Sequence, residues 1–249
     1  MQDPTPDDVP EPEQEGSGKR HLRERGKAEA GSRSFDAGRC QCELYACFDT
    51  DPAPIRDFLR WLLSSYDRPE PGEVLDMGCG PGRMLSELAG LGWKVIGMEP
   101  DGDFFLRAVE RSRGLAGVDV VRGGFDGMHD PERFDLIAAI NGPFSYLLTV
   151  RERVDALRRA WKALKPGGLL FLDMANPLWI LRHFRDPPLR VRRTHRGRVL
   201  YEQHNRFDLH DDLWEQIDVF RIEDASSGRR RTLRKRHRLA MVSFPQIEY

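Results

Sequence analysis

The sequence predicts an α/β fold, a mostly parallel sheet followed by an antiparallel β insertion, for three reasons. First, an apolar run at Val74 and Leu75 breaks at glycines and continues into a helix-like stretch that ends near Leu91; this is how a strand turns tightly into a helix. Second, strand-like and helix-like stretches alternate as far as residue 174, as in a parallel sheet. Third, the stretches after residue 189 are extended and separated by turn residues, which is typical of an antiparallel meander.

Composition excludes several classes of protein. A chain of 249 residues is long enough for one large α/β domain with an elaboration. The formal net charge of -1 gives no global electrostatic reason to bind nucleic acid or an anionic membrane. No apolar stretch approaches the roughly 20 residues that span a bilayer, and no signal peptide is visible, so we expect a cytoplasmic protein without membrane contact.

The cysteine pattern predicts no metal site. Three of the four cysteines, Cys40, Cys42 and Cys47, are spaced C-x-C-x4-C. Zinc sites favour a spacing such as C-x2-C and need a fourth ligand, and neither is present. We therefore expect reduced thiols and no bound metal.

The chain divides into three predicted regions. Residues 1–35 are rich in proline, glycine and charge and have almost no large apolar side chains, so they are expected to form a disordered tail. Residues 36–177 are expected to be the core domain, and 178–249 the antiparallel insertion with the end of the core. The first core helix is predicted by apolar residues at helical spacing, namely Ile55, Phe58, Leu59, Leu62 and Leu63.

The most informative stretch is the turn after the first strand, which reads Asp76-Met-Gly-Cys-Gly-Pro-Gly82. Glycines can take positive φ and let the backbone approach a ligand closely, and free N–H groups at a helix start attract polar groups. A second strand from Lys94 to Met98 ends in Glu99, 23 residues after Asp76. A carboxylate at the tip of this strand can accept hydrogen bonds from both hydroxyls of a ribose.

At these residues the chain resembles the class I S-adenosylmethionine-dependent methyltransferases, whose first motif is an acidic residue, any residue and G-x-G-x-G. The resemblance implies a Rossmann-like, doubly wound sheet. It also implies that Asp76 to Gly82 line the methionine and ribose parts of S-adenosylmethionine and that Glu99 holds the ribose. The cofactor-binding candidates in this part of the chain are therefore Asp76, Gly78, Cys79, Gly80, Pro81, Gly82, Glu99 and Pro100.

The adenine side departs from the family pattern. Asp101 can cap a helix that runs to about Arg113, and Val118 to Val121 reads as a third strand. In the family, an acidic residue after the glycine that follows this strand receives the adenine amino group, but here that position is Gly124. We therefore expect either that Asp126 takes this role or that the backbone alone reads the adenine, and the resemblance implies that Phe125 lies beside the ring.

The fourth strand, Phe134 to Ile140, leads into a loop that begins at Asn141. Because ligands bind at the carboxyl ends of parallel strands, this loop is expected to border the methyl group. The resemblance makes Asn141 and Tyr146 candidates to face the substrate, against turn chemistry for Asn141 and packing for Tyr146. Ile140 and Asn141 complete the cofactor-binding candidates.

Two aromatic residues before the first core helix have two interpretations. In the family this segment closes over the methionine end of the cofactor, which makes Tyr45 and Phe48 candidates for that wall. Both could equally be ordinary core aromatics.

A helix from Val150 to Leu164 and a strand from Leu169 to Met174 complete the core. The phrase ALKPGGLLFLDMANP, which ends at Pro177, looks like the fifth strand unit of the family. The resemblance thus covers about Cys40 to Pro177.

Three further strands are expected at 198–209, 213–223 and 230–242, an insertion that could form a lid, as in small-molecule N- and O-methyltransferases with a β insertion. The strand at 229–238 is strongly basic and could contact phosphate. We favour a solvated sheet face, because the facing strands carry acidic residues that can pair across strands: Glu202, Asp208, Glu215, Asp218, Glu223 and Asp224.

The end of the sequence also departs from the family, whose members continue into a helix and a final hairpin. Residues 244–249 look like the start of that helix, so the terminal helix and strand pair are expected to be missing. Either the polypeptide is truncated or its sheet is closed differently. In the truncated case the fifth strand becomes an edge with unpaired backbone groups.

The predicted function is S-adenosylmethionine-dependent transfer of a methyl group to N or O of a small molecule. The alternatives are an RNA or protein methyltransferase that uses the strand at 229–238, and a non-catalytic scaffold with the cofactor fold. A general base is not required, and Tyr146, His195 and His204 are the side chains that could serve as one. The sequence specifies neither the acceptor nor the oligomeric state.

Overall fold

The computed structural model describes residues 40–66, 71–194 and 197–248. Every described residue lies in one unit of the chain, Ser32–Tyr249. The expected tail at residues 1–35 and the candidate base His195 lie outside the described residues.

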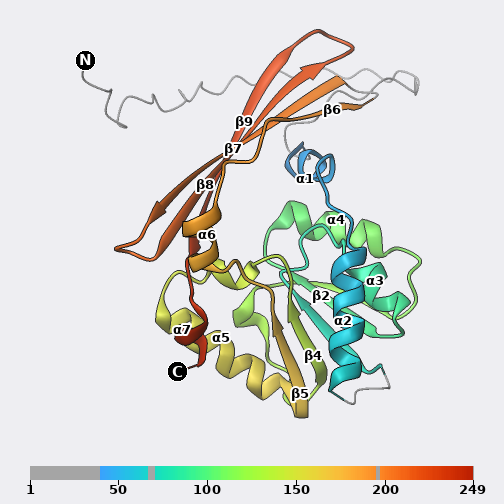
Figure 1. Ribbon diagram of the computed structural model, residues 1–249. Helices are drawn as coiled ribbons and strands as arrows, with labels where there is room; N and C mark the ends of the chain where they lie inside the picture. The colour runs from blue at the N-terminus through green and yellow to red at the C-terminus, as the bar shows by residue number, and fades with distance from the viewer. Residues whose placement is uncertain (1–39, 67–70, 195–196, 249) are drawn as a thin grey trace, which may run out of the picture. The chain divides into compact units, whose positions relative to one another are not determined.

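The first sheet, sheet A, is parallel and has the strand order β3-β2-β1-β4-β5 (Figure 1). The order reverses at β1, so the crossovers run outward in both directions, as in a doubly wound sheet. This confirms the fold predicted for the core. The strands are β1 (Glu73–Met77), β2 (Lys94–Glu99), β3 (Val118–Arg122), β4 (Phe134–Ala139) and β5 (Leu164–Leu172).

Helices cover both faces of sheet A because successive strand residues point to opposite sides. One face carries Val74, Val95 and Leu136 against three helices, and the other carries Leu75 and Ile137 against a fourth helix. The helices of the first face are α2 (Ala53–Ser65), α3 (Leu85–Gly90) and α4 (Gly102–Ser112), and the fourth is α5 (Val150–Ala163). The short helices η1 (Phe125–Gly127) and η2 (Pro143–Tyr146) follow β3 and β4.

Helix starts agree with the capping signals in the sequence. The Asp101 side chain accepts hydrogen bonds from the backbone N–H groups of Asp103 and Phe104 at 3.0 and 3.2 Å. Thr149 and Glu152 form a reciprocal capping box at the start of α5. Such caps satisfy N–H groups that have no partner within the helix.

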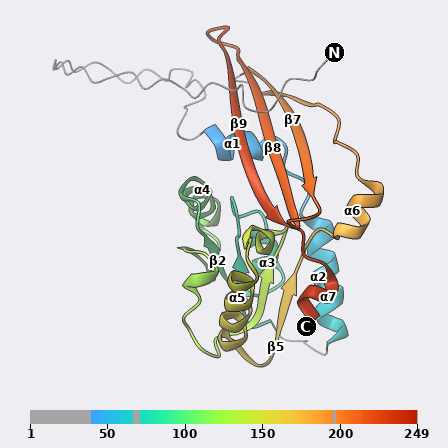
Figure 2. The same ribbon diagram turned by 90° about the vertical axis from the view of Figure 1, so that its left-hand side faces the viewer.

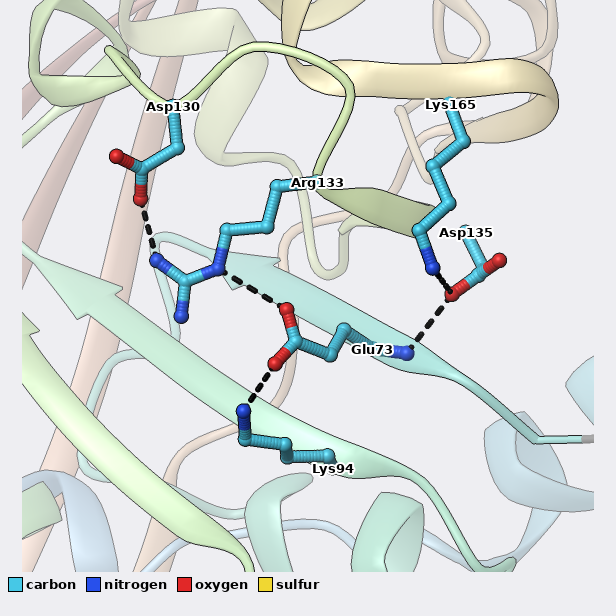
Figure 3. Close-up of polar contacts among 6 residues, drawn as sticks. All are labelled: Glu73, Lys94, Asp130, Arg133, Asp135 and Lys165. Carbon is cyan, nitrogen blue, oxygen red and sulfur yellow. Dashed lines mark hydrogen bonds and ion pairs between the residues drawn. The ribbon is translucent and has the colours of Figure 1, made fainter.

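A network of charges ties the strands of sheet A together at their amino ends (Figure 3). Arg133 Nε donates to Glu73 Oε2 at 3.0 Å, and Glu73 also binds Lys94 on β2. Asp135 Oδ2 accepts from Lys165 Nζ at 2.8 Å and from the Glu73 backbone N–H at 2.9 Å. The network joins β1, β2, β4 and β5 at the end of the sheet opposite to the glycine turn.

The second sheet, sheet B, is an antiparallel meander with the order β6-β7-β8-β9, which confirms the predicted β insertion. Figure 2 shows β7, β8 and β9 side by side. Three strands match the predicted stretches, whereas the first, β6, was not predicted. The strands of sheet B are β6 (Arg190–Thr194), β7 (Gly197–Asp208), β8 (Leu213–Asp224) and β9 (Arg230–Ala240). Helix α6 (Pro177–His183) precedes it and α7 (Phe244–Glu248) follows it.

An aromatic cluster joins sheet B to helix α1 (Cys40–Ala46) and the loop after it. Phe220 is buried, stacks on Tyr201 with ring centroids 4.7 Å apart, and meets Tyr45 edge-on at 5.0 Å. Phe48 lies against the same pair, at 5.1 Å from Tyr201. The cluster fixes the position of α1 over one face of sheet B.

Acidic and basic side chains pair across sheet B, as expected for a solvated face. Glu223 receives Arg198 Nε at 2.8 Å and Arg230 Nε at 3.2 Å, and Glu202 pairs with Arg221. The expectation is wrong for Asp218, which is fully buried, and for Asp224, which is buried and caps the turn after β8.

No helix in the described part of the chain is long and apolar enough to cross a membrane.

Candidate functional site

The glycine turn is fixed by hydrogen bonds to the neighbouring strand. The backbone N–H groups of Gly78 and Cys79 both donate to the Met98 carbonyl oxygen, at 2.8 and 3.1 Å. Gly78, Gly80 and Gly82 all have positive φ, at 70°, 56° and 80°. The turn therefore needs glycine for backbone reasons at all three positions.

The three glycines differ in what surrounds them. A Cβ on Gly78 would lie 2.5 Å from Cβ of Pro143, and one on Gly82 would lie 3.1 Å from the Cα of Ala108 in α4. A Cβ on Gly80 would meet nothing within 4 Å. Gly78 and Gly82 thus permit close packing, whereas Gly80 leaves open space in front of the backbone.

Glu99 is held at the tip of β2 by two backbone groups. Its Oε2 accepts from Gly80 N–H at 2.8 Å, and its Oε1 accepts from Asp101 N–H at 2.9 Å. Burial raises the pKa of Glu99, and these two hydrogen bonds oppose that shift. The carboxylate is therefore oriented by the turn itself and keeps lone pairs for further donors.

Asp76 is a buried acid with an unpaired oxygen. Its side chain is almost inaccessible, and its Oδ2 has no hydrogen-bond partner among the described residues. Burial, followed by the nearby Glu99 carboxylate, raises the pKa of Asp76 to about 7. A buried polar atom without a partner is costly, so Oδ2 is a candidate to receive a donor from a ligand.

A cleft of about 1070 Å³ opens where the carboxyl ends of β1, β2 and β4 meet sheet B and α1. Asp76, Gly80 and Glu99 lie along one part of it. Asn141, with φ of 63°, borders it beyond β4, and its N–H is held by Asp173 Oδ2 at 2.9 Å. Sheet B, α1 and the loop after α1 supply Tyr45, Phe48, Arg190, Tyr201, Lys235 and His237.

The segment after β3 forms another wall of the cleft, with Gly124, Phe125 and Asp126. The Phe125 ring meets Phe144 edge-on at 5.8 Å. A Cβ on Gly124 would lie 3.1 Å from Asp126 Oδ1. The Asp126 carboxylate therefore lies beside the position that is acidic in the family.

The opposite wall carries a chain of hydrogen bonds. Tyr146 Oη, from η2, lies 2.7 Å from Nδ1 of His237 on β9. His237 Nε2 lies 3.2 Å from Asp218 Oδ2 and 3.0 Å from Tyr45 Oη. Asp218 also accepts from Tyr201 Oη at 2.9 Å. The chain runs from the cleft surface to a buried carboxylate.

Comparison with known proteins places the glycine turn in a family. Residues 74–168 match the family model described as a methyltransferase domain.

Residues 74–168 are a methyltransferase domain.

Curated relatives cover part of the chain. The match to the cypemycin N-terminal methyltransferase of Streptomyces sp is 30% identical over 136 residues, 54% of each chain. The match to a trans-aconitate 2-methyltransferase of Rhodopseudomonas palustris is 30% identical over 140 residues, 55% of this chain and 50% of the relative. The chain spans about half the length of the curated relatives that it matches.

Solved structures share the fold of a larger part of the chain. DesVI from Streptomyces venezuelae has a TM-score of 0.72 at 20% identity and covers 87% of this chain and 88% of its own. The sugar N-methyltransferase from Streptoalloteichus has a TM-score of 0.70 at 19% identity, with 91% and 87% coverage. At these identities the likeness shows the fold alone, and it includes residues outside the methyltransferase domain.

Most site residues predicted from the sequence line the cleft of the methyltransferase domain. Gly82 does not, because it packs against α4, and His204 does not, because its side chain is exposed and lies 3.8 Å from Glu202. The predicted residues that the structure brings to the cleft are Asp76, Gly78, Cys79, Gly80, Pro81, Glu99, Pro100, Phe125, Asp126, Ile140, Asn141 and Tyr146.

Tyr45 and Phe48 line the cleft and also pack in the aromatic cluster. The sequence did not single out His237, and it assigned Asp218 to solvent. One signal was available, because Asp218 alternates along β8 with the apolar Phe220 and Ile222, and alternate residues share a face.

The two ways in which glycine serves the turn predict different costs of adding a methyl group. We expect Gly78→Ala to lower the free energy of unfolding by about 2–4 kcal/mol, because positive φ and the contact with Pro143 both oppose it. Gly80→Ala is the matched control and should lose only about 1 kcal/mol, from positive φ alone. Urea unfolding followed by circular dichroism measures both, and equal losses would contradict the packing role of Gly78.

Proposed function

We propose that the protein is an S-adenosylmethionine-dependent methyltransferase that acts on N or O of a small molecule. The observation that carries the proposal is the open backbone at Gly80 between two acids, Asp76 with an unpaired oxygen and Glu99 oriented by the turn. A ligand with a ribose and an amino acid carries hydroxyl and ammonium donors for these groups, so the residues present fit this ligand.

Each part of the cleft then has a defined task. Glu99 accepts hydrogen bonds from the ribose hydroxyls, and the open space at Gly80 lets the ligand lie close to the protein backbone. Asp76 accepts a hydrogen bond from the methionine part. Phe125 and Asp126 form the adenine side, with Asp126 in the role that the family gives to the position of Gly124. Ile140 and Asn141 border the methyl group at the end of β4.

S-adenosylmethionine, held by the Asp76, Gly80 and Glu99 side of the cleft, would supply a methyl group that its sulfonium already activates for transfer to the acceptor. The protein's own contribution is to position the acceptor and to exclude water. Sheet B, α1 and the loop after α1 serve this purpose, because they line the cleft with aromatic side chains, namely Tyr45, Phe48 and Tyr201.

A small-molecule acceptor is favoured over RNA by the charges on sheet B. Arg230 and Arg238, both on the basic strand, pair with Glu223 at 3.2 Å and with Glu215 at 3.9 Å, which leaves less charge for a phosphate backbone. One structure of similar fold is named a sugar N-methyltransferase. A cytoplasmic location remains a prediction from the sequence.

The proposal is tested by isothermal titration of the full chain with S-adenosylmethionine and S-adenosylhomocysteine. We expect micromolar binding by the parent and no measurable binding by Gly80→Arg, because the arginine side chain would fill the open space. Gly114→Arg is the matched control, since Gly114 also has positive φ with nothing within 4 Å but does not line the cleft. No binding by a folded parent chain would overturn the proposal.

The acceptor class is tested by transfer of a radiolabelled methyl group to a panel of amino sugars and hydroxylated small molecules, with total RNA beside it. Labelled small molecules are expected. Labelled RNA with a strong salt dependence would replace the small-molecule proposal by the RNA alternative. Cofactor binding without transfer to either class would favour a scaffold.

A further inference from the structure

We propose that Tyr146, His237 and Asp218 form a proton relay that removes the proton from the methyl acceptor, an inference that rests on the proposed function. Tyr146 is the residue that touches the acceptor, and His237 and Asp218 are positioning residues that act through it. The relay suits an acceptor that carries an ammonium or hydroxyl group, because only such acceptors must lose a proton.

Asp218 has the surroundings of a carboxylate that stays ionised. It is fully buried on β8 and accepts hydrogen bonds from Tyr45, from Tyr201 at 2.9 Å and from Gln216 Nε2 at 3.0 Å. Burial opposes ionisation, but these donors and His237 outweigh it and lower the pKa of Asp218. The negative charge faces the imidazole of His237.

The partners of His237 determine which ring nitrogen carries the proton. Nε2 faces two oxygens that need a donor, Asp218 Oδ2 at 3.2 Å and Tyr45 Oη at 3.0 Å. The Tyr45 proton is already donated to Asp218. The neutral ring therefore carries hydrogen on Nε2, and Nδ1 keeps a lone pair that accepts from Tyr146 Oη at 2.7 Å.

Tyr146 connects this buried pair to the cleft. It lies on η2, directly after the end of β4, and its side chain lines the cleft while its hydroxyl reaches His237. Burial and the nearby acids, of which Asp218 contributes most, raise the pKa of Tyr146 to about 12. The phenol therefore stays neutral near pH 7 and can only pass a proton on.

The proton transfer balances as follows. The acceptor N–H or O–H gives its proton to Tyr146 Oη while the Tyr146 proton moves to His237 Nδ1. The ring becomes an imidazolium paired with the Asp218 carboxylate, and Tyr146 remains neutral. Water takes the proton from the ring when the products leave.

Other ionisable groups line the same cleft as the His237 ring. Tyr45 comes from α1, Tyr201 from β7 and Lys235 from β9, where Lys235 lies 3.8 Å from Asp101 Oδ2. Lys235 and His237 line the same cleft. Asp218 is the acid whose carboxylate directly contacts the ring.

The first test reads the histidine itself and needs no acceptor. In the full chain labelled with 15N-histidine, long-range 1H–15N spectra at pH 8 should show His237 with hydrogen on Nε2. The signal is assigned by its loss in His237→Gln. Asp218→Asn should reduce this preference, whereas His210→Gln, an exposed histidine in the turn after β7, should leave it unchanged. Hydrogen on Nδ1 in the parent chain would overturn the relay.

The second test uses an acceptor identified in the methyl-transfer panel. Tyr146→Phe and His237→Gln should lower kcat by about 100-fold or more, as expected for loss of proton transfer. They should also change the pH dependence of kcat, because the groups that take up the acceptor's proton are lost. S-adenosylhomocysteine affinity should stay within about threefold of the parent chain, since the relay lies on the acceptor side of the cleft.

The outcomes separate the two proposals. A parent chain that binds neither S-adenosylmethionine nor S-adenosylhomocysteine refutes the proposed function, whatever the spectra show. Variants that bind S-adenosylhomocysteine normally and keep the parent pH profile refute the relay and leave the proposed function standing.

Discussion

Asp76→Asn is expected to stabilise the protein without ligand increasingly as pH rises. In the folded chain the pKa of Asp76 is raised to about 7 by burial and by Glu99, from an ordinary value of 3.8. The folded state therefore holds this proton more tightly than the unfolded state, and that stability is lost as pH rises through 7. Asparagine has no charge to bury at any pH, so the variant escapes this loss.

The free energy of unfolding, measured by urea titration at pH 5 and pH 8, should differ between variant and parent by about 2–3 kcal/mol more at pH 8. Asp126→Asn provides a matched control, because Asp126 is an exposed acid in the same cleft. Its difference from the parent should be the same at both pH values. Parallel curves for Asp76→Asn would refute the buried, raised-pKa carboxyl.

Asp76→Asn should also weaken binding of S-adenosylmethionine by about 10–100-fold, because it removes the negative charge and the unpaired carboxylate oxygen that would accept a hydrogen bond from the ligand. A gain in stability together with a loss of affinity would identify Asp76 as a residue kept for the ligand at the expense of the fold. Isothermal titration at pH 8 measures the affinity.

The parts of the fold that the sequence predicted depend on neighbours a few residues apart. Asp101 caps α4 by accepting from backbone N–H groups two and three residues later. The apolar residues that predict α2 recur at each helical turn, three or four residues apart. The start of β5 was placed too late for a different reason. The strand begins at Leu164 because this residue pairs with Phe134, and a shift in register then leads to the Leu136–Leu169 pair.

Strand β6 and helix α6 are among the elements that the sequence analysis did not predict. Strand β6 reads Arg-Val-Arg-Arg-Thr, which has one apolar residue and no strand pattern of its own. It pairs with β7 in register, and Arg190 lies over the Tyr201 ring at 4.5 Å. Helix α6 begins after its cap Asn176 but follows the region in which strand-like and helix-like stretches alternate along the sequence. Strand β6 thus follows from its pairing with β7, a tertiary contact that its own local pattern does not contain.

The candidate site divides in the same way. The side with Asp76, Gly80 and Glu99 could be predicted because a contiguous motif and one acid at a fixed distance define it. The acceptor side takes Tyr45, Tyr146 and His237 from three elements that are far apart in the sequence. Single histidines carry no spacing signal, so their meeting is visible only in the folded chain.

Phe220→Ala is expected to produce the largest loss of stability, about 3–5 kcal/mol, because it removes a fully buried aromatic ring. The ring stacks on Tyr201 and meets Tyr45 edge-on, so its loss also frees the two phenols that donate to Asp218. The free energy of unfolding from urea titration measures the first effect. The 15N-histidine spectrum measures the second, as a weaker preference of His237 for hydrogen on Nε2.

Phe244→Ala is the matched control, because Phe244 in α7 is 74% exposed. Its effect on unfolding should stay within about 0.5 kcal/mol, and its histidine spectrum should equal that of the parent. If Phe220→Ala destabilises the chain but leaves the His237 signal unchanged, the hydrogen bonds to Asp218 hold the relay without help from the aromatic cluster. If both change, sheet B and α1 orient the relay through that packing, and mutations far from the cleft should then alter proton transfer before they alter cofactor binding.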